Sequence, residues 1–223
     1  MDTTALLLTL RLAATTTVLL LLIGLPLAYW IAFSRGKARF FVQAAVTLPL
    51  VLPPTVIGFY LLVALGPLTP VGRLLIRLIG HPLAFSFTGL VIGSVIYSLP
   101  FAVQPLVNGF SAVDRDSIET AAVLGASPLR IFTGVTLPLA KASLLTSIIL
   151  AFTHTVGEFG VVLMLGGDIP GATRTLSISL YNQVQDFDYQ QANHTALLLL
   201  LLSFTALLLI YLRPASADRR DLV

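Results

Sequence analysis

The sequence predicts an all-α membrane protein built as a bundle of about five transmembrane helices. Of its 223 residues, 57% are hydrophobic and only 10% are charged, whereas a soluble domain carries about 25% charged residues. The mean hydropathy of +0.95 agrees with several apolar stretches long enough to cross a bilayer. So few polar residues cannot coat a water-facing surface of this size, which argues against a soluble enzyme, a disordered protein or a nucleic-acid-binding domain.

Five apolar segments each hold the roughly 20 residues that a helix needs to cross the hydrocarbon core of a membrane. We expect these spans in a single transmembrane domain that covers 1–223, over residues 12–33, 40–65, 85–107, 142–165 and 195–212. The chain contains no cysteine, which excludes disulfides and thiolate metal sites.

The first span, 12–33, is expected to be retained, because its apolar core is longer than that of a signal peptide and no small-residue cleavage site follows it. The last span, 195–212, is a leucine-rich helix followed by a charged tail over 213–221, which is typical of a stop-transfer segment.

The distribution of lysine and arginine predicts the orientation, since these residues collect in cytoplasmic loops. Three lie in one set of loops and nine in the other, with Arg11 at the mouth of the first span left out. The three are Arg73, Arg77 and Arg174, and the nine are Arg35, Lys37, Arg39, Arg115, Arg130, Lys141, Arg213, Arg219 and Arg220. The N-terminus is therefore expected outside the cell and the C-terminus in the cytoplasm.

Three prolines interrupt the second predicted span. Pro49, Pro53 and Pro54 each remove a backbone donor and clash with the preceding helical turn. Within lipid, the freed carbonyl groups must be satisfied by neighbouring helices or by water. Two interpretations stay open, a kink held by packing and one wall of a polar pathway.

The third predicted span combines proline with polar side chains. Pro100 and Pro105 lie beside Gln104, and Asn108 follows. Polar side chains at this depth usually face protein or water rather than lipid. Gln104 and Asn108 are therefore candidate pathway residues, with hydrogen bonding between packed helices as the alternative.

The segment 111–137, between the third and fourth spans, is predicted to form two short helices joined by a tight turn. Asp116 is expected to cap the first helix, with Glu119 three residues later completing a capping box. Gly125 is expected to end that helix, because the position after a helix often requires a left-handed conformation.

The second short helix is expected to start at Ser127 as its cap, with Pro128 in its first position. Pro138 fits the first turn of the fourth span. A long loop with helices of its own and exposed apolar residues is usually functional and suits a surface that docks a partner.

This loop resembles the "EAA" loop of ABC-importer permeases. Glu119, Thr120 and Ala121 are followed by Gly125 and then by Leu-Pro at 137–138; the one departure is Thr120, where that family prefers alanine. The resemblance implies a type I importer permease whose coupling helix sits in a groove of a cytoplasmic ATP-hydrolysing subunit. The implied coupling residues are Asp116, Glu119, Ala121, Ala122, Gly125, Ala126 and Pro128. Glu119 can also serve only as a cap.

Glu158 is the one acid of the fourth predicted span. It follows Lys141 by about 17 residues, or roughly 25 Å at about 1.5 Å per residue, so we expect it near the outer surface. His154 precedes it by one helical turn on the same face, which allows a contact between the two. Glu158 is either a charge-sensitive part of an outer gate or a hydrogen-bonding group that holds the break at 157–160. With no HExxH pattern and no third ligand, a metal site is not expected.

Further stretches resemble a narrower group, the molybdate-type oxyanion permeases. They are LPLVLPPTVIG at 48–58, GEFG at 157–160, IPG at 169–171 and TRT at 173–175, and the resemblance covers nearly the whole chain. It implies molybdate as the solute, with tungstate tolerated. The stretch QDFDY at 185–189 resembles sulfate permeases at least as much, so sulfate or thiosulfate and a separate tungstate system stay as alternatives.

The resemblance also implies partners. These are a second copy of this chain, two cytoplasmic ATP-binding subunits, one extracytoplasmic solute-binding protein and the lipid of a bacterial or archaeal plasma membrane. The chain lacks GxxxxGK[ST], so ATP and Mg²⁺ are expected on the partner, with no cofactor or catalytic residue here. A proton-driven secondary transporter using His154 and Glu158, and an intramembrane enzyme, are the other classes considered; an inverted repeat and a GxSxG motif are missing.

Overall fold

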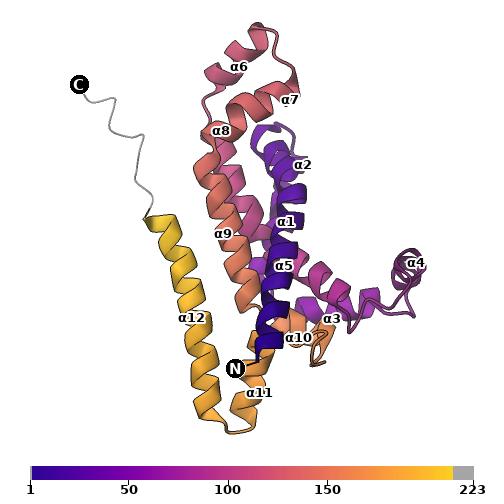
Figure 1. The fold of residues 1–223 in the computed structure, drawn as a ribbon. Coiled ribbons are helices and arrows are strands. Elements are labelled where there is room, and N and C mark those ends of the chain that lie inside the picture. Colours follow the sequence, from indigo (N-terminus) through magenta and orange to yellow (C-terminus); the bar gives the residue numbers. More distant parts are fainter. Residues whose placement is uncertain (1, 213–223) are drawn as a thin grey trace.

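The computed structural model describes residues 2–212, and every regular element within them is a helix (Figure 1). Three long helices, α1 (Thr3–Phe33), α5 (Phe87–Ser111) and α9 (Lys141–Gly157), pack against one another and form the centre of the bundle. α12 (Tyr189–Tyr211) packs against α9 and stands at the edge. By length and composition three helices could cross a membrane, or up to five spans result if each of two bent helix pairs counts as one.

The first and last spans begin earlier than their apolar stretches indicate. α1 starts at Thr3 rather than at Leu12, because the Asp2 side chain accepts a hydrogen bond from the backbone N–H of Ala5 at 2.9 Å. α12 starts at Tyr189 rather than at Thr195, and Asp188 caps it in the same way. A side-chain cap satisfies a free backbone N–H at the start of a helix. Each of these helices therefore begins at its cap, several residues before its apolar stretch.

Two helices occupy the predicted span over 40–65, and together they form one of the two bent pairs that can count as a single broken span. α2 (Ala38–Val51) and α3 (Pro54–Leu65) meet at an angle of 112°. Leu52 and Pro53 between them are extended, and prolines 53 and 54 supply no backbone N–H to continue the helix. Pro49, in contrast, lies inside α2.

The fourth predicted span, 142–165, is also divided. α9 ends at Gly157 and α10 (Gly160–Gly166) begins after Glu158 and Phe159, whose backbones are not helical. α10 packs against α3 and α5. The two interrupted segments of the sequence therefore meet in space.

The contact between α3 and α10 depends on glycine. A Cβ atom on Gly160 would lie 2.8 Å from Cβ of Pro54, and one on Gly58 would lie 2.7 Å from Cβ of Met164. Such distances are well inside van der Waals contact, so these two glycines allow a helix approach that alanine would obstruct.

Two further helices were not predicted. α4 (Pro70–Ile79) starts at a Thr69 cap, and α11 (Leu176–Gln185) is joined to α1 by a buried hydrogen bond from the Leu176 N–H to Oγ1 of Thr9 at 2.8 Å. At 10 residues each, both are too short to be found by a search for spans of about 20 residues.

Candidate functional site

The segment 111–137 forms a folded projection at one end of the bundle (Figure 1). It contains α6 (Arg115–Val123), α7 (Pro128–Ile131) and the π-helical turn η1 (Phe132–Thr136). The turn between α1 and α2, which carries Arg35 and Lys37, lies at the same end of the bundle. The structure thus groups these basic residues with the projection.

The cap of α6 is Asp114, so the predicted capping box of Asp116 and Glu119 is wrong. Oδ1 of Asp114 accepts the Asp116 N–H at 3.3 Å, and Glu119 lies in the middle of the helix. Only three residues join α5 to α6, and Val113 among them is buried. This short connection places the earlier aspartate at the N-cap.

The end of α6 follows the prediction. Gly125 has a φ of +84°, which is the left-handed conformation that glycine adopts at low cost. The Ala126 N–H donates to the carbonyl of Ala121 at 3.0 Å, as in a Schellman turn. Ser127 then caps α7 and Pro128 takes the first position, both as predicted.

The predicted coupling residues come together on this helical hairpin. Asp116, Glu119, Ala122, Gly125 and Pro128 are exposed, and Ala121 and Ala126 are half-buried. The sequence predicted exposed apolar residues in this loop without naming them, and the structure places three of them at its tip. Val123, Leu124 and Leu129 are 87%, 81% and 71% exposed. Their position close to the predicted turn at Gly125 is the feature of the sequence that could have identified them.

Pro138 is not in the first turn of the fourth span. It lies in α8 (Leu137–Leu139), and α9 begins only at Lys141 after a bend of 76°. The root of the projection is instead held by aromatic packing. The ring of Phe132 contacts Tyr29 of α1 at a centroid distance of 5.3 Å and Phe110 of α5 at 6.0 Å. The root of the projection therefore packs directly against α1 and α5.

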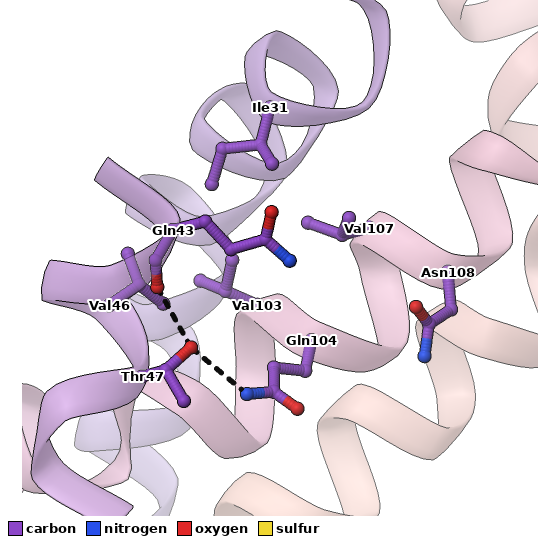
Figure 2. A pocket seen from close by; sticks show the side chains of 8 residues that line it. All are labelled: Ile31, Gln43, Val46, Thr47, Val103, Gln104, Val107 and Asn108. Atoms are coloured by element: carbon purple, nitrogen blue, oxygen red, sulfur yellow. Dashed lines mark hydrogen bonds between the residues drawn. The ribbon is translucent and has the colours of Figure 1, made fainter. Parts of the chain in front are cut away.

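A polar cavity of about 250 Å³ lies between α2 and α5 (Figure 2). The predicted pathway residues Gln104 and Asn108 line it, together with Gln43 and Thr47 of α2. Nε2 of Gln104 donates to Oγ1 of Thr47 at 3.2 Å. Gln43 and Thr47 could not be selected from the sequence, because their proximity to Gln104 depends on how α2 packs.

A second cavity, of about 460 Å³, lies at the break between α9 and α10 and is lined by Pro54, His154 and Glu158. Pro53 caps α3 beside it and is not among the lining residues. The candidate pathway residues therefore fall into two groups, one at each cavity, and not into a single site.

His154 and Glu158 line the same cavity without a hydrogen bond between them. Nδ1 of His154 lies 2.9 Å from the Ser98 hydroxyl, and its ring stacks on Phe101 at 3.8 Å. Glu158 is only 4% exposed, and neither carboxylate oxygen has a hydrogen-bond partner within residues 2–212. The structure shows no hydrogen bond between His154 and Glu158, and the two roles considered for Glu158, a gate residue or a hydrogen-bonding group at the break, stay predictions.

We expect Glu158→Gln to preserve the assembled protein and to leave its Tm unchanged or higher. The reason is that a neutral amide costs less to bury than a carboxylate without a partner. Thermal unfolding of purified protein in detergent, followed by size-exclusion chromatography, measures this. Glu119→Gln, at an exposed position of α6, is the matched control. A Glu158→Gln variant that fails to assemble would instead assign the carboxylate a structural role.

Comparison with known proteins accounts for both the projection and the bundle. Residues 24–216 match the family model described as "Binding-protein-dependent transport system inner membrane component". The molybdenum transport system permease protein ModB of Azotobacter vinelandii is 50% identical over 210 residues, covering 94% of this chain and 93% of the relative. The protein of the same name from Mycobacterium tuberculosis is 41% identical over 180 residues, covering 81% of this chain and 68% of the relative.

Among solved structures, inward-facing MetNI, a methionine ABC transporter, matches with a TM-score of 0.73 at 17% identity, covering 94% of this chain and 93% of that chain. This likeness confirms the predicted helical fold. The chain therefore belongs to the binding-protein-dependent inner membrane components, the non-catalytic permease subunits of ABC importers.

Proposed function

We propose that this chain is the permease subunit of an ATP-driven molybdate importer that also accepts tungstate. The observation that carries the proposal is the identity to the Azotobacter vinelandii molybdenum permease, which extends over nearly all of both chains. The polar residues of the cavity between α2 and α5 are amides and a hydroxyl, which are donors suited to a tetrahedral oxyanion.

The assembly we propose contains two copies of this chain, two cytoplasmic ATP-binding subunits and one external solute-binding protein. ATP and Mg²⁺ are held by the ATP-binding subunits. The projection formed by α6 and α7 is the docking element, and its exposed apolar tip of Val123, Leu124 and Leu129 supports this role, because such patches mark protein interaction sites.

The proposed orientation in the inner membrane places the projection in the cytoplasm and the N-terminus outside. It is supported by the Lys/Arg count and by the position of the turn with Arg35 and Lys37 at the same end as the projection (Figure 1). The predicted cytoplasmic tail, 213–223, lies outside the described residues.

In this assembly Gln104 and Asn108 line the pathway on the cytoplasmic side of the bundle. Pro53, Pro54, His154 and Glu158 form the outer gate, where the interrupted segments meet. The close contact of Gly160 with Pro54 supports this assignment, because a tight contact between two broken helices closes the space between them.

Reconstitution tests the proposal. The chain is co-expressed with its ATP-binding subunits, inserted into liposomes, and supplied with the solute-binding protein loaded with molybdate, tungstate, sulfate or thiosulfate. We expect ATP-dependent uptake of molybdate and tungstate and at least tenfold slower uptake of the sulfur oxyanions. Faster uptake of sulfate than of molybdate would overturn the assigned substrate, and failure to co-purify with an ATP-binding subunit would overturn the assigned class.

A further inference from the structure

We propose that the cavity between α2 and α5 is an uncharged binding station for the transported oxyanion. The proposal rests on the function proposed above and adds the residues that hold the anion during its passage. Gln43 and Thr47 contribute from α2, and Gln104 and Asn108 contribute from α5 (Figure 2).

The cavity offers several donors in a small space. Each of its three carboxamide groups carries two N–H donors, whereas the hydroxyl of Thr47 donates to the backbone carbonyl of Gln43 at 2.8 Å. Figure 2 shows Thr47 and Gln104 meeting between α2 and α5, with the Gln43 carboxamide directed toward Val107 and Asn108 one turn further along α5. The volume of about 250 Å³ is several times the ~30 Å³ that a water molecule occupies in the liquid, so an oxyanion enters with part of its hydration shell.

The absence of charge is the functional feature of the lining. All eight residues that line the cavity are neutral, and the other four are Ile31, Val46, Val103 and Val107. Conduction requires an ion to be bound well enough to enter and weakly enough to leave. A lysine or arginine here would retain a dianion, whereas amide donors hold it through hydrogen bonds alone.

The neighbouring charges favour an anion over a cation, whereas a carboxamide alone suits either, since its N–H groups bind anions and its oxygen binds cations. Arg39 precedes Gln43 by four residues on α2, so its backbone lies roughly 6 Å away at about 1.5 Å per residue. Arg35 and Lys37 lie in the adjoining turn. A positive turn next to the station repels cations and draws an anion toward that end of the bundle.

The station shares two of its lining residues, Gln104 and Asn108, with a second cavity. That cavity, of about 340 Å³, is also lined by Phe101, Thr146 and Leu150. The two carboxamides thus face both spaces, and an anion can exchange one set of donors for the other without leaving hydrogen-bonding distance of α5.

Helix packing is the competing explanation, because Gln104 and Thr47 join α2 and α5 by a hydrogen bond. Gln104→Glu separates the two. Glutamate has nearly the same shape as glutamine. Its carboxylate can accept a hydrogen bond from Thr47 once the Thr47 hydroxyl rotates toward it. The link between helices survives, whereas a negative charge is placed against the oxyanion.

The experiment measures initial rates of molybdate uptake in reconstituted liposomes, after size-exclusion chromatography has shown that each variant assembles. We expect Gln104→Glu to lower the rate at least tenfold. The control Gln190→Glu adds the same charge at an exposed position of α12 and is expected to leave the rate within twofold of the wild type. Equal uptake by Gln104→Glu and the wild type would overturn the proposal.

Gln43→Lys provides a second measurement, because Gln43 is exposed and a longer side chain there leaves helix packing intact. A fixed positive charge is expected to retain molybdate, lowering uptake at least fivefold. If the wild type takes up molybdate and both variants do so at the same rate, the binding station is overturned and the proposed function stands. A wild type that does not take up molybdate overturns the proposed function itself.

Discussion

Gly125→Val is expected to abolish ATP-driven uptake while the chain still inserts into the membrane. Gly125 has a φ of +84° at the end of α6, and a β-branched residue in that conformation is strained by roughly 1–3 kcal/mol. The strain is relieved most cheaply by unwinding the last turn of α6, since no side chain of α6 is buried in the chain. The docking element then loses its shape, and we expect uptake to fall at least tenfold with membrane insertion unchanged.

Gly80→Val is the matched control for this effect. Gly80 ends α4 with a φ of +87°, and no atom lies within 4 Å of the position that a Cβ would occupy at either glycine. The backbone strain is therefore the same, but α4 lies away from the projection (Figure 1). The measurement compares uptake rates and ATPase rates of the two variants. Equal losses in the two would show that general destabilisation, and not the docking element, explains the result.

Local sequence signals were sufficient to predict much of the projection. The Gly125 turn and the start of α7 at Ser127 and Pro128 are confirmed, because each depends on residues adjacent in the chain. The same reasoning failed at Asp116, where two aspartates lie two residues apart and Asp114 takes the cap. Which aspartate is used depends on the exit from α5, and that is a tertiary constraint.

The interrupted spans could not be predicted in the same way. Prolines 53 and 54 indicated a kink, but the 112° angle between α2 and α3 follows from the packing of α3 against α10. At the other break, counting residues along a straight helix predicted how far Glu158 lies along the span but not whether it is buried. The chain departs from that helix at Glu158, and its side chain is buried against neighbouring elements.

The likeness to importer permeases pointed to the loop that we propose as the docking element, since its motif is a pattern along the sequence. The cavity lining was only half predicted. Gln104 and Asn108 stood out as polar residues in an apolar span, whereas nothing in the sequence shows that Gln43 and Thr47 of α2 face α5. Their relevance depends on a contact between helices separated by 57 residues at the Thr47–Gln104 hydrogen bond.

Gly160→Ala is expected to destabilise the protein and to disturb closure of the proposed outer gate. A Cβ atom at this position would lie 2.8 Å from Cβ and 3.1 Å from Cγ of Pro54, and the rigid proline ring cannot rotate out of the way. Overpacking of this kind costs about 1–3 kcal/mol, which corresponds to a fall in Tm of roughly 2–12 °C for a chain of this length. Thermal unfolding in detergent measures the loss.

Gly157→Ala, at the same break, is expected to change the Tm in the opposite direction. No atom lies within 4 Å of a Cβ at Gly157, and that residue is the last of α9, where alanine is a better helix former than glycine. Its Tm is therefore expected to be equal to or above that of the wild type. If α3 and α10 close the pathway by direct contact, Gly160→Ala also increases ATP-independent leakage of molybdate from loaded liposomes, and Gly157→Ala does not. A Gly160→Ala variant with unchanged Tm and no leak would contradict a gate formed by this contact.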